Sequence, residues 1–341
     1  MLIRSKAPLR IGLAGGGTDV SPYSDEFGGA VLNASISLYA YSTIKPLNNG
    51  KIILNAIDRN VRIELDSTEF LEINGSLNLQ RGVYNRIVKE FNNNKPLSFE
   101  LSTYVDAPAG SGLGTSSTLT VSIIAAFTEW LKLPLGEYDI AHLAYEVERL
   151  DLDMAGGKQD QYAATFGGIN FMEFLNNDKV IVNPLPLKQE YLDELNFNLL
   201  LYYTGTTRLS AKIIESQTKN IISKNKNSLE GMHKLKEQAQ KMKETILKGN
   251  ISQVGKILDF GWKYKKQIAS EISNPIIDNI YDIAMKNGAT GGKISGAGGG
   301  GFMMFFCPDN SRYNVINALN GFGGEFRRYN FTNKGISSWT L

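Results

Sequence analysis

The chain has 341 residues, of which 42% are hydrophobic and 21% are charged, and its 36 basic residues nearly balance 34 acidic ones. This composition is typical of a globular protein, and a net charge of +2 gives no electrostatic signature of nucleic-acid or polybasic membrane binding. A single cysteine excludes intrachain disulfides, and two histidines leave little for a histidine-rich metal site or a Ser-His-Asp triad.

The N-terminal residues 1–8 lack the apolar run of a secretory signal. No stretch of the sequence reaches the roughly 18 apolar residues that span a bilayer. We therefore expect a cytoplasmic protein, and the length predicts two domains.

Strand-like runs dominate the first part of the chain and helical patterns dominate the last part. Runs rich in β-branched and aromatic residues predict strands, and apolar residues at helical spacing predict helices. In chain order we expect strands at 4–14 and 30–44, a hairpin at 52–65, a helix at 78–91, a strand at 97–105, helices at 119–131 and 137–150, a hairpin at 167–182, a strand at 196–203, lysine-rich helices over 209–288, and strands near 301–306 and 325–331. Pro184 and Pro186 mark the expected boundary between a domain of residues 1–185 and one of 186–341.

A glycine-rich segment, Pro108 to Thr118, joins the strand at 97–105 to the following helix. Its sequence is Pro-Ala-Gly-Ser-Gly-Leu-Gly-Thr-Ser-Ser-Thr. The alternating glycines allow backbone angles that a Cβ forbids, and the hydroxyl residues are good helix N-caps. A strand, a glycine loop and a helix N-terminus bring backbone N–H groups together around an anion, most naturally a phosphate. A glycine-rich turn without a ligand is the plainer alternative at this point.

Two further glycine clusters occur, at residues 15–17 and 296–301. The second has the glycine spacing of a dinucleotide-binding loop, but a strand-like Phe-Met-Met-Phe-Phe follows it where that motif needs a helix. The central segment lacks the lysine of a Walker loop. These patterns argue against nicotinamide and P-loop nucleotide binding.

Acidic and hydroxyl residues near the loops allow another design for phosphoryl transfer, which needs a cation, ligands for that cation and a group that receives the acceptor's proton. Asp160 follows two glycines at the start of an expected helical turn, so it is either an N-cap or a functional carboxylate. The hydroxyl of Ser116 is a candidate ligand, and the other candidate carboxylates are Glu146, Glu148, Asp151 and Asp153.

Three segments together resemble the GHMP kinases, a superfamily that includes galactokinase, homoserine kinase, mevalonate kinase and phosphomevalonate kinase. Residues 7–19, Ala-Pro-Leu-Arg-Ile-Gly-Leu-Ala-Gly-Gly-Gly-Thr-Asp, resemble the first motif of that superfamily. Residues 108–117 resemble the second motif, and residues 293–301, Lys-Ile-Ser-Gly-Ala-Gly-Gly-Gly-Gly, resemble the third. The motifs occur in the expected order, so the resemblance covers nearly the whole chain.

Three shorter segments make the chain most similar to the bacterial D-glycero-D-manno-heptose 7-phosphate kinases within that superfamily. They are Ala-Gly-Gly-Gly-Thr-Asp at 14–19, Gly-Gly-Lys-Gln-Asp-Gln-Tyr-Ala-Ala at 156–164 and Tyr-Thr-Gly-Thr-Thr-Arg at 203–208. Fucokinases share the Gly-Lys-Gln-Asp-Gln segment but usually carry a tryptophan where Gly17 stands, which favours the heptose enzymes.

The resemblance implies roles for individual residues and implies ATP and Mg²⁺ as cofactors. Asp160 takes the place of the catalytic aspartate, and Arg10 takes that of the basic residue beside it, whose opposite charge favours the ionised carboxylate. Glu148 and Ser116 match the magnesium ligands of the family. The second motif would bind the ATP phosphates through Pro108, Gly110, Ser111, Gly112, Leu113, Gly114, Thr115, Ser116 and Ser117.

The resemblance also implies a sugar side of the site. Asp19 matches a position that hydrogen-bonds sugar hydroxyls in sugar-specific members. A phosphorylated sugar needs a cation for its phosphate, and among Arg59, Lys158, Arg208 and Lys293 we favour Arg208, which follows an expected strand and precedes a helix. The expected substrate-binding set is Gly17, Thr18, Asp19, Lys158, Arg208, Gly298 and Gly299.

The resemblance implies an α/β (α+β) fold of two domains, in which the first has a mixed sheet with a left-handed β-α-β crossover and the second is ferredoxin-like. It implies ATP-dependent phosphorylation of the anomeric hydroxyl of a heptose 7-phosphate to the 1,7-bisphosphate, for nucleotide-activated heptose and surface glycan synthesis. The alternatives are another anomeric sugar kinase, of fucokinase or galactokinase type, and a sugar-phosphate- or ATP-binding regulator on the same fold. The expected partners are ATP and a sugar phosphate, with no nucleic acid and no membrane.

Overall fold

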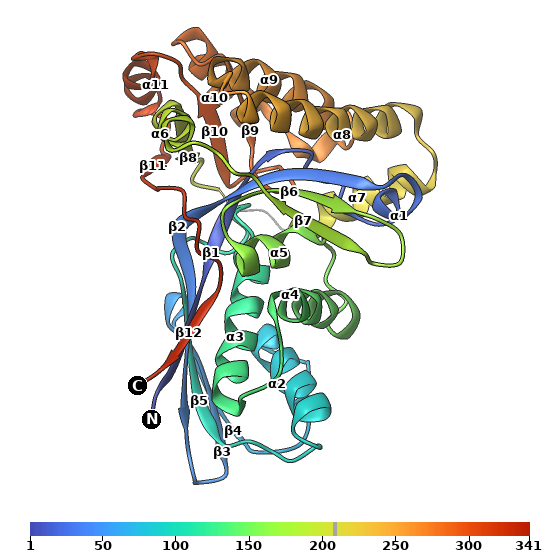
Figure 1. The fold of residues 1–341 in the computed structure, drawn as a ribbon, viewed down its shortest axis with the longest axis vertical. Helices are drawn as coiled ribbons and strands as arrows, with labels where there is room; N and C mark the ends of the chain where they lie inside the picture. The colour runs from blue at the N-terminus through green and yellow to red at the C-terminus, as the bar shows by residue number, and fades with distance from the viewer. Residues whose placement is uncertain (207–209) are drawn as a thin grey trace.

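Two β-sheets divide the molecule, and each is covered by its own set of helices (Figure 1). The larger sheet has eight strands and the smaller sheet has four. The computed structural model describes residues 1–206 and 210–341. The mixed α/β architecture with a second, antiparallel sheet confirms the predicted fold class.

The long strand β2 (Gly29–Pro46) is the centre of the larger sheet. On one side it pairs with β1 (Ile3–Ala14), and on the other side its first residues pair with β6 and its last residues pair with β5. The strand order is β12-β1-β2-β5-β3-β4, with β6 and β7 as a branch from β2. The remaining strands are β3 (Lys51–Ala56), β4 (Val61–Asp66), β5 (Phe99–Val105), β6 (Ile169–Phe174), β7 (Val180–Pro184) and β12 (Ser337–Thr340).

The pairing of β1 with β2 is irregular at two places, between Pro8 and Arg10 and between Gly12 and Ala14. Bulges of this kind bend a strand and re-aim its side chains. Both irregularities adjoin residues that line the cavity described below, Arg10 and Gly12. The end of β1 therefore both pairs within the sheet and forms part of the wall of this cavity.

Helices α2 to α5 cover the larger sheet, and the longest of them, α3, packs against β1 and β2 (Figure 1). The side chains of Ile123, Ile124 and Phe127 on α3 are fully buried. This burial of the apolar face fixes the position of the glycine-rich segment that precedes α3. The helices are α2 (Asn78–Phe91), α3 (Thr115–Leu131), α4 (Glu137–Glu146) and α5 (Gln159–Phe166), with a π-helical turn at Val147–Asp151 between the last two.

One pair of neighbouring strands in the larger sheet, β3 and β5, is parallel. The chain passes from β3 to β5 through β4 and α2, so this is the crossover connection of the first domain. That the crossover is left-handed stays a prediction from the resemblance.

The smaller sheet has the strand order β11-β8-β10-β9, and all its neighbouring strands are antiparallel. Helices α7 to α10 join its first two strands and α11 joins its last two, which gives the ferredoxin-like arrangement predicted for the second domain. Its strands are β8 (Leu199–Tyr203), β9 (Gly291–Ile294), β10 (Phe302–Phe306) and β11 (Glu325–Arg327), and its helices are α7 (Ser210–Ile222), α8 (Lys226–Leu247), α9 (Val254–Lys265), α10 (Pro275–Lys286) and α11 (Ser311–Leu319).

Short helical segments complete the chain. They are α1 (Tyr23–Phe27), α6 (Gln189–Asn198) and 3₁₀ turns at Ile57–Arg59, Ile251–Gln253 and Ser270–Ile272. Asn274 shows how sequence sets an element boundary, because its side chain accepts hydrogen bonds from the N–H groups of Ile276 and Ile277 while Pro275 occupies the first helical position of α10.

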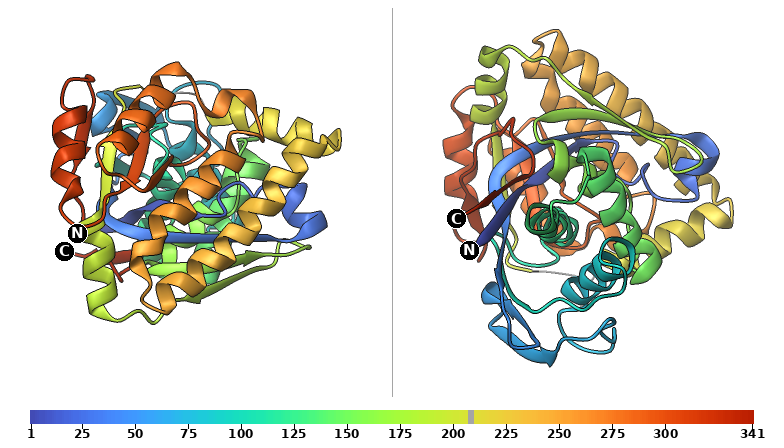
Figure 2. Two further views of the ribbon diagram at one scale, coloured as in Figure 1. Left: turned by 90° about the horizontal axis from the view of Figure 1, so that it is seen from above. Right: turned by 60° about the horizontal axis from the view of Figure 1, so that its bottom comes forward.

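The two halves of the chain share a hydrophobic core. Leu9 and Leu32 of the larger sheet belong to the same buried cluster as Met242 of α8 and Leu258 of α9. The last strand, β12, returns to pair with β1, so the two termini lie side by side (Figures 1 and 2). We propose residues 1–185 and 186–341 as the two domains, with β12 as the part of the second that completes the sheet of the first.

Two expected elements differ from the structure. The strand expected over 196–203 begins only at Leu199, because α6 continues through Asn198, whose side chain donates a hydrogen bond to the backbone oxygen of Glu194 one turn earlier. The helix expected over 137–150 is α-helical only to Glu146, and the π-helical turn follows.

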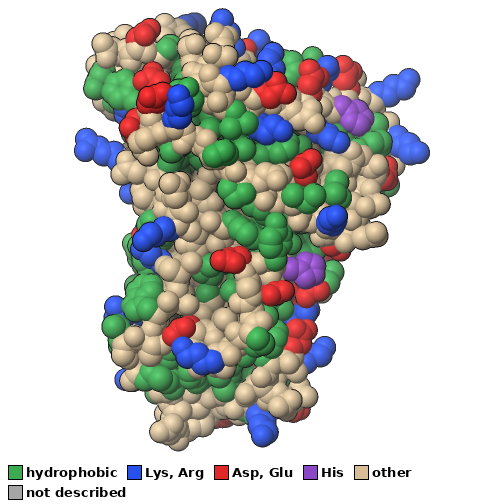
Figure 3. Space-filling model, in the orientation of Figure 1, with side chains coloured by type: hydrophobic (Ala, Val, Ile, Leu, Met, Phe, Trp, Pro, Cys, Tyr) green, Lys and Arg blue, Asp and Glu red, His purple; other side chains and the backbone are tan. Residues whose placement is uncertain are grey.

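Acidic and basic side chains are interspersed over the face of the molecule that Figure 3 shows. Among the described helices, none combines the length and the apolar character that crossing a membrane requires.

Candidate active site

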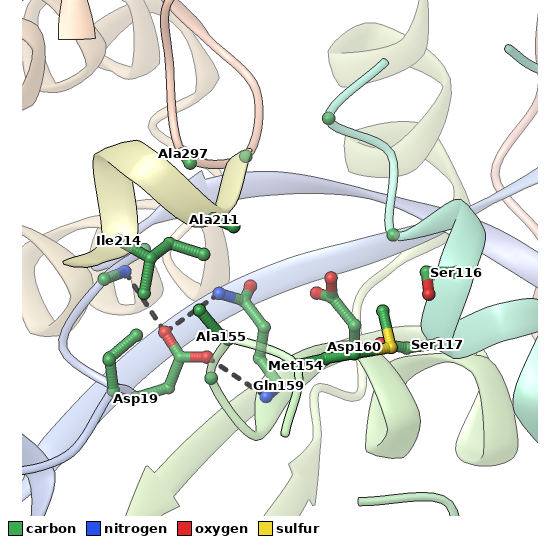
Figure 4. A pocket seen from close by; sticks show the side chains of 18 of the residues that line it. Asp19, Ser116, Ser117, Met154, Ala155, Gln159, Asp160, Ala211, Ile214 and Ala297 are labelled. Atoms are coloured by element: carbon green, nitrogen blue, oxygen red, sulfur yellow. Dashed lines mark hydrogen bonds between the residues drawn. The ribbon is translucent and has the colours of Figure 1, made fainter. Parts of the chain in front are cut away.

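A cavity of about 510 Å³ lies where the end of β1, the glycine-rich segment before α3 and the smaller sheet's domain meet. Figure 4 shows Asp19, Gln159 and Asp160 facing Ile214 of α7 and the loop that carries Ala297. The polar and charged side chains that line the cavity are those of Arg10, Asp19, Thr115, Ser116, Ser117, Glu148, Arg149, Asp153, Gln159, Asp160, Glu215, Gln217, Lys265 and Lys293.

A bidentate ion pair joins Arg10 of β1 to Asp160 in the first turn of α5. The Nε of Arg10 donates to Oδ1 of Asp160 at 2.7 Å, and Nη2 donates to Oδ2 at 2.8 Å. The Arg10 side chain is 5% exposed and the Asp160 side chain 22%, so the carboxylate keeps an open side toward the cavity. Charge-assisted bonds in this geometry fix both the position and the orientation of the carboxylate.

Glu148 is completely buried, and three side chains donate to its carboxylate. Ser116 Oγ donates to Oε1 at 2.9 Å, Ser117 Oγ donates to Oε2 at 2.7 Å, and Gln161 also donates to Oε2. Glu148 lies in the π-helical turn, and such turns are frequent at functional sites. Carboxylate and hydroxyl oxygens side by side are the hard ligands that suit Mg²⁺.

Arg86 of α2 holds this π-helical turn from outside. It donates to both carboxylate oxygens of Asp151, at 2.7 and 2.8 Å, and to one oxygen of Glu146 at 3.0 Å. These two acidic residues flank Glu148 on either side. The network therefore fastens both ends of the turn to α2.

Asp19 is the third carboxylate that is fixed within the cavity, after Asp160 and Glu148, and it is 2% exposed. It accepts hydrogen bonds from the backbone N–H of Gly17 at 3.1 Å, from the backbone N–H of Gln159 at 3.1 Å and from the Gln159 side chain at 3.0 Å. A Cβ on Gly157 would lie 1.9 Å from Asp19 Oδ2, so only glycine allows the chain to pass here. Figure 4 shows the bonds between Asp19 and Gln159.

The glycine-rich segment before α3 has positive φ at Gly110, Gly112 and Gly114, as glycine allows. The Gly112 carbonyl accepts from Arg10 Nη1 at 2.6 Å and from Ser295 Oγ at 2.9 Å, so the segment is tied to both the first and the third motif. No side chain caps the N-terminus of α3 among the described residues. Its first N–H groups are therefore free for an anion in the cavity.

Two buried lysines of the second domain line the cavity, Lys265 at the end of α9 and Lys293 in β9. Burial lowers the pKa of Lys265 to about 8, although nearby Asp19 acts in the opposite direction. Burial, together with the charges of Lys265 and Arg10, lowers the pKa of Lys293 far below its ordinary value. The sequence does not predict Lys265 as a site residue, because it is one of many lysines in a helical region without a motif.

The structure brings most of the expected site residues to the cavity: Arg10, Gly17, Asp19, Gly110, Gly112, Gly114, Thr115, Ser116, Ser117, Glu148 and Asp160. Three residues of the second motif do not line it. Pro108 is exposed, Ser111 is buried with its carbonyl bonded to Phe302, and Leu113 packs in the hydrophobic core.

Four residues of the expected substrate set also lie outside the cavity lining. The Thr18 hydroxyl forms hydrogen bonds with the backbone carbonyls of Gly15 and Ala30 and accepts one from the N–H of Ala30. Lys158 is paired with Asp178 at 2.6 Å and with Asp25 at 3.4 Å.

Gly298 and Gly299 pack against the segment that contains Ile272, whose carbonyl accepts from the N–H of Gly299. The favoured phosphate ligand, Arg208, lies outside the described residues.

Comparison with known proteins gives matches to both halves of the chain. The family model "GHMP kinases N terminal domain" matches residues 78–168, and "GHMP kinases C terminal" matches residues 242–325. A D-glycero-alpha-D-manno-heptose 7-phosphate kinase from Campylobacter jejuni is 51% identical over 339 residues, which is 99% of each chain.

A crystal structure of a D-glycero-D-manno-heptose 1-phosphate kinase from Bacteroides thetaiotaomicron superposes with a TM-score of 0.85 at 46% identity and covers 99% of each chain. An L-fucokinase/L-fucose-1-P guanylyltransferase from Bacteroides fragilis is more distant, at 27% identity over 90% of this chain and 35% of its own length.

These matches agree with the three glycine motifs, which the structure brings together around one cavity. Similarity at 51% identity extends over the whole chain. The predicted relationship is therefore confirmed, and this chain belongs to the GHMP kinase family of ATP-dependent phosphotransferases.

Proposed function

We propose that this chain transfers the γ-phosphoryl group of ATP to the anomeric hydroxyl of D-glycero-D-manno-heptose 7-phosphate, giving the 1,7-bisphosphate and ADP. One observation carries the proposal: the Arg10–Asp160 pair and the Ser116–Glu148 cluster open into one cavity beside an uncapped helix N-terminus. The full-length similarity to a heptose 7-phosphate kinase supports the choice of sugar.

Asp160 is the proposed proton acceptor. As the anomeric oxygen attacks the γ-phosphorus, its proton passes to the Asp160 carboxylate, the new O–P bond forms, and the bond from that phosphorus to the bridging oxygen breaks with its electron pair going to ADP. Arg10 binds both carboxylate oxygens, which fixes the orientation of this proton acceptor. General-base assistance of this kind typically contributes about 10²–10⁴ in rate.

The ATP phosphates are proposed to lie on the glycine-rich segment at Gly110 to Ser117. The free N–H groups at the start of α3 and the helix dipole both favour negative charge there. Because little covalent chemistry falls to the protein in phosphoryl transfer, this positioning supplies much of the catalysis.

Mg²⁺ is proposed to be held by Glu148 and Ser116. Their oxygen ligands fit it, and no cluster of three or more His, Cys, Asp or Glu side chains suited to a metal occurs in the described part of the chain. A site with one carboxylate is what Mg²⁺ uses when substrate phosphates complete its coordination. An ion held by these two residues would neutralise charge on the phosphates.

Asp19 is the proposed partner of the sugar hydroxyls. Its carboxylate is fixed by three hydrogen bonds, and a carboxylate that is held in this way can select hydroxyls by geometry. A Cβ on Gly17 would lie 3.3 Å from the side-chain amide of Gln217, which itself donates to the Gly17 carbonyl.

Alternative functions differ in the acceptor. A fucokinase or galactokinase-like activity would use an unphosphorylated sugar, and a regulator would bind the same ligands without turnover. The relatives themselves differ, since one is named for heptose 7-phosphate and another for heptose 1-phosphate. Of these two heptose phosphates, only the 7-phosphate has a free anomeric hydroxyl that could lie next to Asp160.

The test is an assay of ADP release with D-glycero-D-manno-heptose 7-phosphate, the 1-phosphate, L-fucose, D-galactose and D-mannose. We expect the highest kcat/KM with the 7-phosphate and a product with a new anomeric phosphate by ³¹P NMR. Preference for an unphosphorylated sugar would establish the other kinases instead, and binding without ADP release from any sugar would establish the regulator.

A further inference from the structure

Two ammonium groups from different elements converge on one point of the cavity. Lys265 Nζ donates to the Gly296 carbonyl at 2.6 Å, and Lys293 Nζ donates to the Gly12 carbonyl at 2.8 Å. A Cβ built on Gly16 would lie 4.0 Å from the Nζ atom of each lysine. The two charges therefore flank the same glycine.

Neither lysine forms an ion pair with a carboxylate in residues 1–206 and 210–341, and each is about 95% buried. One backbone carbonyl satisfies one of the three N–H groups of each ammonium. Buried charges without a counter-ion are costly, and like charges side by side add to the cost. The lowered pKa of each lysine has the same cause, because burial disfavours the charged form. An anion bound between them would remove this cost.

We propose that Lys265 and Lys293 form the subsite for the phosphate group that the sugar substrate already carries. This inference rests on the proposed function, because it names the residues that distinguish a sugar phosphate from a sugar. The two ammonium groups would offer their remaining N–H groups to the phosphate oxygens.

The position of the pair favours the sugar phosphate over the nucleotide. The Cβ position of Gly16 that lies 4.0 Å from both lysines also lies 3.9 Å from Nε2 of Gln159, and this same Nε2 donates to Asp19. The lysines are therefore on the side of Asp19, the proposed ligand of sugar hydroxyls. The uncapped N-terminus of α3, proposed for the ATP phosphates, is formed by a different segment.

Lysine-to-methionine variants test the proposal by separating the two substrates. Lys265→Met and Lys293→Met should each raise the KM for heptose 7-phosphate at least about tenfold and leave the KM for ATP within about twofold. The preference for the 7-phosphate over unphosphorylated D-glycero-D-manno-heptose should fall by a similar factor. Lys263→Met is the matched control, because Lys263 is on the same helix, exposed and paired with Asp259.

The opposite pattern overturns the proposal. A rise in the KM for ATP with that for the sugar unchanged would assign the lysines to the nucleotide phosphates, and unchanged values for both substrates would leave them a structural role only. Lys265→Arg and Lys293→Arg keep the charge and check folding, and they should retain more of the sugar-phosphate affinity than the methionine variants.

Calorimetry separates failure of this proposal from failure of the proposed function. Heptose 7-phosphate and inorganic phosphate are titrated at pH 8.5 in buffers of different ionisation enthalpy. Binding to the wild-type protein should take up protons, and Lys265→Met should reduce that uptake. Proton-linked binding without ADP release would reject only the kinase reaction, whereas turnover of the sugar phosphate without any effect of the lysine variants would reject only the subsite.

Discussion

Arg10 and Asp160 are 150 residues apart in the sequence, yet their side chains form two parallel hydrogen bonds of 2.7 and 2.8 Å. The third group on the same guanidinium, Nη1, donates to the carbonyl of Gly112 at 2.6 Å. One side chain thus sets the distance between the proposed proton acceptor and the proposed phosphate loop. Phosphoryl transfer depends on such positioning.

Asp160→Asn should lower kcat by at least about a hundredfold while ATP binding persists. The amide keeps the size of the side chain but cannot take the hydroxyl proton. Steady-state kinetics and ATP calorimetry measure the two effects. Asp282→Asn, an exposed change on α10, is the control and should behave as wild type. Near-normal turnover by Asp160→Asn would remove the role assigned to this carboxylate.

Glu148→Gln should raise the Mg²⁺ concentration needed for half-maximal activity by about tenfold or more, since a neutral amide is a poorer ligand for a hard cation. The substitution keeps the shape of the side chain in its fully buried position. A Mg²⁺ titration of the initial rate at saturating ATP makes the measurement. Glu137→Gln, exposed at the start of α4, provides the comparison, and identical titrations for both variants would argue against Glu148 as a ligand.

Local patterns predicted much of this fold because local physical chemistry decides it. The helix expected at 78–91 is α2 from Asn78 to Phe91, and within the region expected to be helical, Asn274 and Pro275 form the capped start of α10. The strand expected at 196–203 starts later, at Leu199, because α6 continues through Asn198, a poor strand former whose side chain donates to the Glu194 carbonyl. Strand β12 has no strong pattern of its own and exists by pairing with β1.

The site could be predicted only where motifs mark it. Asp160, Glu148 and Asp19 lie in or near glycine motifs, and the structure brings all three to one cavity. Lys158 also lies in a glycine motif, but in the structure its ammonium group is paired with Asp25 and Asp178. Lys265 has no motif, and only the fold shows that its helix ends against the third glycine loop. Partners that are distant in the sequence decide which charged side chains remain available.

Gly157→Ala should raise the KM for the sugar about tenfold or more and leave the KM for ATP nearly unchanged. The new Cβ would lie 1.9 Å from Oδ2 and 2.6 Å from Cγ of Asp19, so the fixed carboxylate must move. Gly321→Ala is the matched control, because its Cβ would meet nothing within 4 Å. If both alanine variants bound the sugar equally well, Asp19 would not be a sugar ligand.

Lys265→Met should stabilise the ligand-free protein at pH 7, although it weakens the proposed phosphate subsite. Burial lowers the pKa of Lys265 to about 8 from an ordinary 10.5, so the unfolded chain binds more protons than the folded one between these values. The cost of burying the charge is therefore fully present below pH 8, on the order of 3 kcal/mol, and declines as the pH rises toward 10.5. The difference in free energy of unfolding between Lys265→Met and wild type, from urea denaturation without phosphate, should shrink from pH 7 to pH 9.5. Lys263→Met should show no such trend, and a Lys265→Met variant less stable than wild type at pH 7 would mean that the bond to Gly296 outweighs the cost of the buried charge.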